Sequence, residues 1–202
     1  MPVYLDDKLM TGDAADLAAA LAAAKAKLAG TRRVIVEVTR GGEPVAVGDL
    51  ASLGQQPVGD AELRLYSADT VDLALSILRP TMAMLEDLRQ KQTQAADAFT
   101  GDNLAEGMRL LGQTMEAWNQ APQAVINSAA LLNIDLRELS PQGRGADELA
   151  TGLVEQLRAL CEQLKAGDSV ALADTLTYEW PQITDQWKAL AQNLIQKIES
   201  QP

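Results

Sequence analysis

Apolar residues recur at spacings of three and four through most of the chain after residue 69, a period that predicts amphipathic helices. A first stripe follows the capping residue Asp69, and three more follow it along the chain. The stripes are Leu75, Leu78, Met82 and Leu85; Leu104, Met108, Leu111, Met115 and Trp118; Leu149, Leu153, Leu157, Leu160, Cys161 and Leu164; and Leu172, Leu176, Trp180, Ile183, Trp187, Leu190, Leu194 and Ile198. The pattern predicts a four-helix bundle made of two antiparallel helix pairs.

Prolines lie within these stripes, and Gly-Asp dipeptides lie between them. Pro80, Pro122 and Pro181 fall inside them, and because proline removes a backbone donor we expect each to kink or break its helix. Gly101-Asp102 and Gly167-Asp168 separate the helices of each pair. Glycine tolerates the left-handed backbone that ends a helix, and the next Asp, Asn or Ser caps the following one.

The two Gly-Asp segments also resemble each other. Residues 100–105 and 166–171 match in type at five of six positions. One interpretation is a duplication, with repeats at 70–132 and 146–200. The other is that Gly-Asp is a common way to join two helices, and the sequence leaves both open.

The N-terminal third alternates instead, with a period of two that predicts strands. A hairpin around Asp6-Asp7 precedes an Ala-rich helix, and a second hairpin turns at Gly41-Gly42. Val34, Val36 and Val38 are expected to share one face of their strand. The predicted elements are strands 2–5 and 8–10, helix 14–29, strands 33–39 and 43–47, a helical turn 49–53 and strand 62–66.

This order of elements resembles the β-grasp, or ubiquitin-like, fold over residues 1–68. The resemblance implies that the final strand runs beside the first and that the sheet packs on the Ala-rich helix. Gly41-Gly42 is internal, so a conjugated modifier is not expected. The predicted fold class is therefore α+β, with a β-grasp domain at 1–68 and a helical-bundle domain at 69–202.

Composition and charge limit the partners and the cellular location that we expect. With 47% hydrophobic and 22% charged residues, the 202-residue chain can bury a core. A net charge of −11 disfavours nucleic acid and anionic membranes as partners. The start lacks the pattern of a signal peptide, and the most apolar stretch, 17–28, contains two lysines and is too short to span a bilayer. We expect a cytoplasmic protein that does not contact the membrane.

Candidate chemistry is sparse. The chain has no histidine, which removes Ser-His-Asp and Cys-His hydrolases and His-ligated metal sites. Its single cysteine, Cys161, cannot form an intramolecular disulfide and lies on a predicted core stripe, where cysteine acts as a small hydrophobe. The stripes also place the acidic residues outward. We therefore expect no catalytic residue, no metal and no cofactor, and hence no enzyme.

Aromatic residues supply the candidates for partner binding. Trp118, Trp180 and Trp187 fit the helical stripes, so they are core residues first. If a proline breaks its helix, a neighbouring tryptophan could instead line a groove and anchor a partner. Tyr178-Glu179-Trp180-Pro181 is the most unusual tetrapeptide of the region. The candidate partner-binding residues are Trp118, Tyr178, Glu179, Trp180 and Trp187.

A second resemblance rests on Gly167-Asp168, Leu172-Ala173, Tyr178-Glu179 and Trp187. In these residues and in layout the chain resembles uncharacterised bacterial proteins with a β-containing N-terminal unit and a helical region, some of them encoded near flagellar genes. The resemblance transfers no site.

Two functional hypotheses remain. The first is a non-enzymatic adaptor, chaperone-like or assembly factor with an unidentified protein partner. The alternative is a small-molecule or metal binder, or an enzyme, with a bundle cavity lined by carboxylates or by Trp and Met. A homo-oligomer is possible through an edge strand or a helical face.

Overall fold

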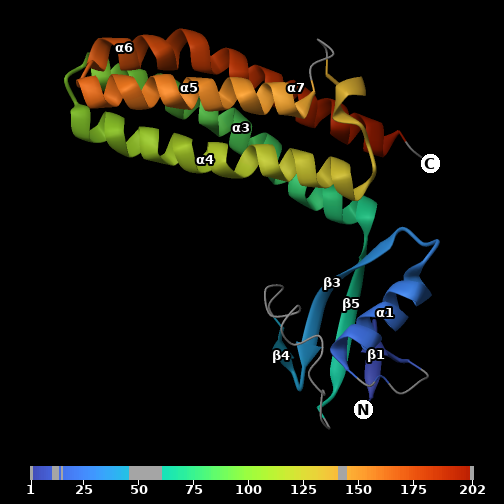
Figure 1. Ribbon diagram of the computed structural model, residues 1–202. Coiled ribbons are helices and arrows are strands. Elements are labelled where there is room, and N and C mark those ends of the chain that lie inside the picture. The colour runs from blue at the N-terminus through green and yellow to red at the C-terminus, as the bar shows by residue number, and fades with distance from the viewer. Residues whose placement is uncertain (1, 11–13, 15, 46–60, 141–144, 201–202) are drawn as a thin grey trace. The chain divides into compact units, whose positions relative to one another are not determined.

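A computed structural model describes residues 2–10, 14, 16–45, 61–140 and 145–200. The chain divides into two compact units, Met1–Leu73 and Ala74–Pro202 (Figure 1). The first unit is an α+β sheet domain and the second is helical, as the sequence predicts.

The N-terminal unit is built on a five-stranded mixed sheet. Its strand order is β2-β1-β5-β3-β4, with β1 parallel to β5 and the other neighbouring pairs antiparallel. The final strand therefore lies beside the first, which confirms the arrangement that the β-grasp order implies. The elements are β1 (Val3–Leu5), β2 (Lys8–Leu9), α1 (Leu17–Leu28), β3 (Arg33–Arg40), β4 (Glu43–Pro44) and β5 (Leu63–Asp69).

Helix α1 packs on this sheet through small residues. Ala20 and Ala24 are fully buried, and alanine lets a helix approach a sheet closely. The Asp16 carboxylate accepts a hydrogen bond from the Ala19 amide at 2.7 Å and so sets the start of the helix. The remaining buried residues of this core are Val3, Leu5, Leu17, Val38, Leu63 and Leu65.

The expectation that Val34, Val36 and Val38 share one face is wrong. The register between β3 and β5 shifts between Ile35 and Glu37, as at a β-bulge. Because the extra residue reverses the alternation, Val38 is buried, Ile35 packs against the same core and Val36 is exposed. The predicted helical turn at 49–53 lies outside the described residues.

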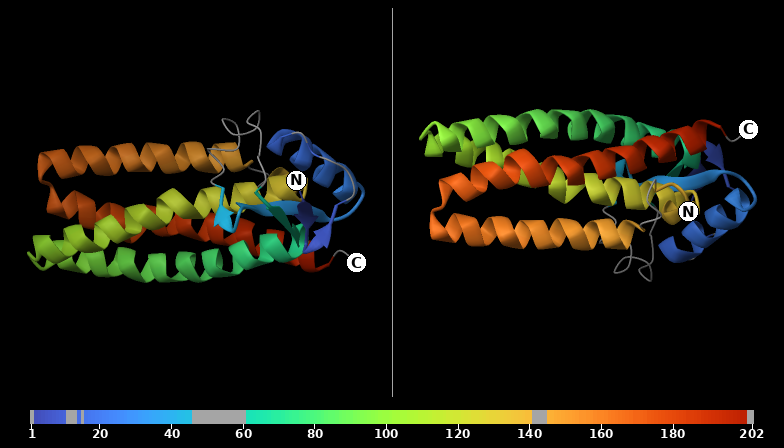
Figure 2. Two further views of the ribbon diagram at one scale, coloured as in Figure 1. Left: turned by 90° about the horizontal axis from the view of Figure 1, so that it is seen from below. Right: turned by 90° about the horizontal axis from the view of Figure 1, so that it is seen from above.

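The second unit consists of four long helical segments, which confirms the predicted bundle (Figure 2). Asp69 accepts from the Val71 amide at 2.8 Å at the start of the first helix. The segments are α3 (Thr70–Thr100), α4 (Leu104–Leu131), α5 (Ala146–Ala166) and a fourth composed of α6 (Ser169–Asp174), η2 (Thr175–Glu179) and α7 (Trp180–Glu199); the short helix η1 (Leu136–Glu138) lies between α4 and α5.

Helices α3 and α7 run antiparallel, as their polar contacts show. Arg79 pairs with Glu199 at 3.1 Å, and Lys188 pairs with Glu86 at 2.9 Å. Further along, the buried Gln92 amide donates to the Thr184 hydroxyl at 3.1 Å. Residue numbers rise on one helix as they fall on the other, so the last helix returns along the first.

The prolines act differently from one another. Helices α3 and α4 continue through Pro80 and Pro122, so neither breaks its helix. Pro181 instead follows the π-helical segment η2, in which the Trp180 amide donates to the Thr175 carbonyl, five residues back. Pro181 then stands in the first turn of α7, where no intrahelical donor is needed.

Two predicted core positions are wrong in α4. Leu104 and Met108 are exposed, and the buried face begins at Gly107, Leu110 and Leu111. The reason is the close approach of Gly107 to Phe99 of α3: a β-carbon on Gly107 would lie 2.8 Å from the phenyl ring. Because α4 packs closely at Gly107, its face with Gly107, Leu110 and Leu111 points toward the core, and Leu104 and Met108 lie on the solvent side.

The expectation that Cys161 faces the core is also wrong, since Cys161 is exposed. The buried residues of α5 are Leu149, Leu153 and Leu160. Cys161 follows Leu160, and each residue turns a helix by about 100°. Its thiol therefore lies at the edge of the apolar stripe and faces solvent.

Candidate interaction surfaces

The three predicted tryptophans lie inside the bundle. Trp118, Trp180 and Trp187 are almost completely buried. Trp118 of α4 and Trp180 of α7 meet edge to face, with ring centroids 6.1 Å apart and planes at 79°. Such a pair adds about 0.5–1.5 kcal/mol beyond burial of its area. In this structure the tryptophans hold helices together and present no surface to a partner.

Polar groups accompany this aromatic cluster. The Thr184 hydroxyl accepts from Gln92 and lies 3.0 Å from the Trp180 carbonyl, to which it can donate. By contrast, the indole N–H groups of all three tryptophans are buried with no acceptor among the described residues. A buried donor without an acceptor costs about 1–3 kcal/mol. The cluster is therefore a buried core in which three indole N–H donors have no acceptor among the described residues.

Tyr178 and Glu179 lie on the opposite, solvent side of the same chain segment. Both are exposed, Tyr178 to 67%. They belong to η2, the π-helical segment before Pro181, and π-helical turns frequently mark functional sites. The structure therefore splits the five predicted partner-binding residues into three core residues and two surface residues.

A further set of exposed apolar side chains lies at one end of the bundle. Leu104 and Met108 occupy the first two turns of α4, and Val170, 72% exposed, is the second residue of α6. Figures 1 and 2 show α4 and α6 beginning at the same end. We call Leu104, Met108 and Val170 the turn-end residues. Tyr178 follows Val170 by eight helical residues, about 12 Å along the axis.

The apolar spacing predicts two of the turn-end residues to be core residues. Leu104 and Met108 continue the spacing of Leu111, so periodicity alone assigns them inward. Val170 gives a usable signal, because it lies off the stripe of Leu172 and Leu176. The contact of Phe99 with Gly107, which decides the outcome for α4, has no signature in the apolar pattern.

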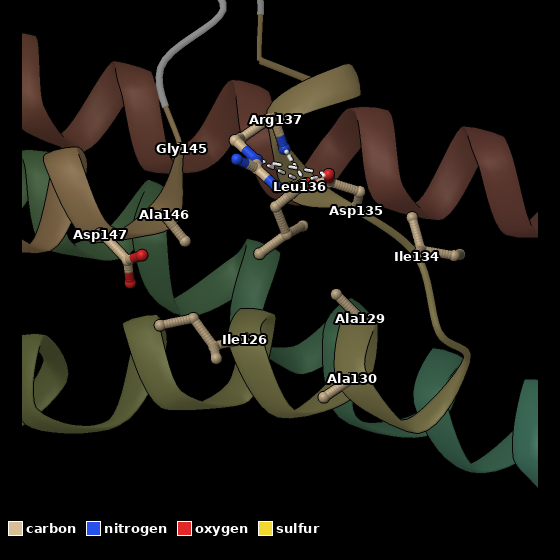
Figure 3. A pocket seen from close by; sticks show the side chains of 10 residues that line it. All are labelled: Ile126, Ala129, Ala130, Ile134, Asp135, Leu136, Arg137, Gly145, Ala146 and Asp147. Atoms are coloured by element: carbon tan, nitrogen blue, oxygen red, sulfur yellow. Dashed lines mark hydrogen bonds and ion pairs between the residues drawn. The ribbon is translucent and has the colours of Figure 1, made fainter.

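The bundle also carries a surface pocket of about 360 Å³ where α4, η1 and α5 meet (Figure 3). Ile126, Ala129 and Leu136 are among its apolar lining residues, and no Trp or Met lines it. Asp135, Arg137 and Asp147 also line it, and the hydrogen bond that the Arg137 guanidinium donates to Asp135 lowers the pKa of that carboxyl. The lining of the pocket is thus part apolar and part charged.

Other ligand chemistry finds little support. Nowhere in the part of the chain that the structure describes do three or more Cys, Asp or Glu side chains gather closely enough to hold a metal ion. The buried polar residues among those described are Thr81, Gln92, Thr114, Ser128, Thr175 and Thr184, with no carboxylate. None of the described helices has the length and apolar character needed to cross a membrane.

The fold defines an α+β protein with a five-stranded mixed sheet in its N-terminal unit and a helical bundle after it. Residues 76–190 match the family described as a domain of unknown function (DUF8042), and the chain belongs to that family. The match covers most of the helical bundle, including both Gly-Asp turns and the tryptophans. No curated protein and no solved structure matches the chain.

Proposed function

We propose that this chain is a non-catalytic protein–protein interaction protein, an adaptor, chaperone-like or assembly factor of the bacterial cytoplasm. The observation that carries the proposal is the exposure of the turn-end residues. Leu104 and Met108 are one helical turn apart and form one apolar face. Val170 is exposed at the same end of the bundle, and an exposed apolar face of this kind is a candidate site of association.

The cytoplasmic location and the bacterial origin are part of this proposal and are argued from the sequence. A single cysteine agrees with a reducing compartment. Bacterial origin and the link to flagellar genes rest on the resemblance carried by Gly167-Asp168 and Tyr178-Glu179.

Site-specific photocrosslinking tests the proposal. A photoreactive amino acid at position 108 of the full chain, expressed in its native cells, should give a discrete protein adduct. Leu104→Lys, one turn away, should reduce its yield severalfold. Val154→Lys on α5 is the matched control, because Val154 and Met108 are each 45% exposed. Absence of a discrete adduct, or equal loss with both substitutions, argues against a protein-binding role for this end.

The alternative, a small-molecule binder, has one observation in its favour. The buried indole N–H donors of Trp118, Trp180 and Trp187 could donate to oxygens of a ligand. Native mass spectrometry of the full chain purified from its own cells checks this. A mass excess that disappears on denaturation supports a ligand, whereas a mass equal to that of the chain alone leaves protein binding as the better proposal.

A further inference from the structure

Positive charge is scarce at the end of the bundle that carries the turn-end residues, and we call this part of the surface the turn end. Arg109 is the only basic residue in segment 92–136, and Lys165 is the only one in segment 159–187. These two segments contain the turn-end residues and both Gly-Asp turns, and all of their residues are described. Charge recognition at the turn end therefore depends mainly on its carboxylates.

Both basic residues are already paired with a carboxylate one helical turn away. The Arg109 guanidinium donates two hydrogen bonds to Glu106, at 2.7 and 2.6 Å. The Lys165 ammonium donates to Glu162 at 3.0 Å. Because each base is offset by its own neighbour, neither balances the other carboxylates of the turn end.

Four further carboxylates of the turn end are exposed and form no ion pair with a described residue. Asp97 lies in the last turn of α3, Asp102 and Asp168 lie in the two Gly-Asp turns, and Asp174 ends α6. Asp168 accepts a capping bond from the Ala171 amide, which leaves its negative charge in place. Such a surface attracts a cationic partner and repels an acidic one.

Leu104 and Met108 supply an apolar surface among these charges. They lie at positions i and i+4 of α4 and are 58% and 45% exposed. Gly112 follows on the same face, and a β-carbon there would meet nothing within 4 Å. The side of α4 beyond Met108 is therefore open to the apolar face of a partner helix, which reads anchors at this spacing.

We propose that the turn end binds a basic amphipathic segment of a partner protein, an inference that rests on the proposed function. The apolar side chains of the segment cover Leu104 and Met108. Its Lys or Arg side chains pair with Asp97, Asp102 and Asp168.

NMR titration of the isotopically labelled full chain tests the proposal. The probe is the synthetic peptide Lys-Leu-Leu-Lys-Lys-Leu-Leu-Lys-Lys-Leu-Leu-Lys, and the control peptide carries Glu at each Lys position. The basic peptide should shift the amide signals of residues 97–112 and 166–171, and the acidic peptide should not. No shift at millimolar peptide, a shift map elsewhere, or equal binding of both peptides overturns the proposal. Concentration-dependent shifts of these amides without peptide would assign the surface to a second copy and also overturn it.

Removing charge without changing size tests the ionic part. Asp97→Asn with Asp102→Asn should weaken the basic peptide about fivefold, since two exposed ion pairs are lost. Asparagine tolerates the left-handed backbone of residue 102, so the fold should survive. Glu116→Gln with Glu155→Gln is the matched control, because it removes the same charge from exposed positions within α4 and α5. Equal weakening by both double variants would assign binding to net charge alone and overturn the proposal.

Photocrosslinking at position 108 in cells separates this inference from the proposed function. Asp97→Asn with Asp102→Asn should reduce the yield of the adduct, whereas the control pair should not. An adduct of unchanged yield overturns the basic partner and leaves the proposed function standing. Absence of any adduct counts against the proposed function and so against both.

Discussion

The two Gly-Asp turns of the bundle have the same two residues but differ in backbone geometry. In both, an amide beyond the helix end donates back into the helix: Asn103 to the Ala98 carbonyl at 2.9 Å, and Asp168 to the Gln163 carbonyl at 3.2 Å. The residue before each of these donors is left-handed. It is Gly167 in the second turn, with φ of 67°, but Asp102 in the first, with φ of 56°.

When the two turns are aligned by their hydrogen bonds, the alignment is therefore shifted by one residue from the alignment of their sequences. Asp102 takes the place of Gly167, and Asn103 takes the capping place of Asp168. The shift shows that a shared dipeptide does not identify equivalent positions, because hydrogen bonding fixes where each helix ends. The duplication of 70–132 and 146–200 stays a prediction, and the turn motif alone is weak support for it.

The largest expected change in stability concerns the contact between Gly107 of α4 and Phe99 of α3. Gly107→Ala places a β-carbon 2.8 Å from the Phe99 ring and should destabilise the chain by about 1–3 kcal/mol. Gly112→Ala on the same helix meets nothing within 4 Å and should stabilise by up to about 1 kcal/mol.

Urea unfolding followed by tryptophan fluorescence measures both, because all three tryptophans lie in the bundle. Equal free energies of unfolding for the two variants would contradict the role given to the contact between Gly107 and Phe99.

The next largest effect separates the two glycines. Gly167→Ala forces an alanine into a left-handed conformation and should cost about 1–2 kcal/mol. Gly101 has no positive φ, and a β-carbon there would lie 3.2 Å from the Asp97 carbonyl. Gly101→Ala avoids the left-handed strain, so it should cost less than Gly167→Ala even with this close contact. Comparable decreases in the urea midpoint for the two variants would contradict the claim that only Gly167 needs a left-handed backbone.

A smaller effect tests the capping role in the second turn. The Asp168 carboxylate accepts from the Ala171 amide at 2.9 Å, so Asp168→Ala should cost about 1 kcal/mol. Asn103 makes the equivalent bond to Glu106 at 3.3 Å, and Asn103→Ala should cost less. Thermal unfolding followed by circular dichroism ranks the two, and a larger loss at Asn103 would reverse the assignment.

Much of the fold follows from the sequence because periodicity reports burial. Alternation and the Ala-rich helix predicted the sheet unit, and the spacing of apolar residues predicted the four helical segments. The errors at Val36 and Leu104 depend on local geometry between elements, a bulge and a glycine contact, that no apolar pattern contains. The error at Cys161 is different, because Cys161 follows the buried Leu160 and the turn of about 100° per residue places it at the edge of the apolar stripe. Of the candidate site residues, the burial of the tryptophans follows from the apolar stripes and the exposure of Val170 from its place off the stripe, whereas the exposure of Leu104 and Met108 does not follow from the sequence pattern.

The smallest effect is a gain in stability at Asp102. A left-handed backbone costs glycine less free energy than aspartate, and the Asp102 side chain makes no hydrogen bond with the described residues. Asp102→Gly should therefore stabilise by about 0.5 kcal/mol. The matched substitution Asp168→Gly removes the cap and should cost a few tenths of a kcal/mol. Opposite signs in the urea midpoints would establish the one-residue shift in solution, whereas equal signs would mean that the turns are in register after all.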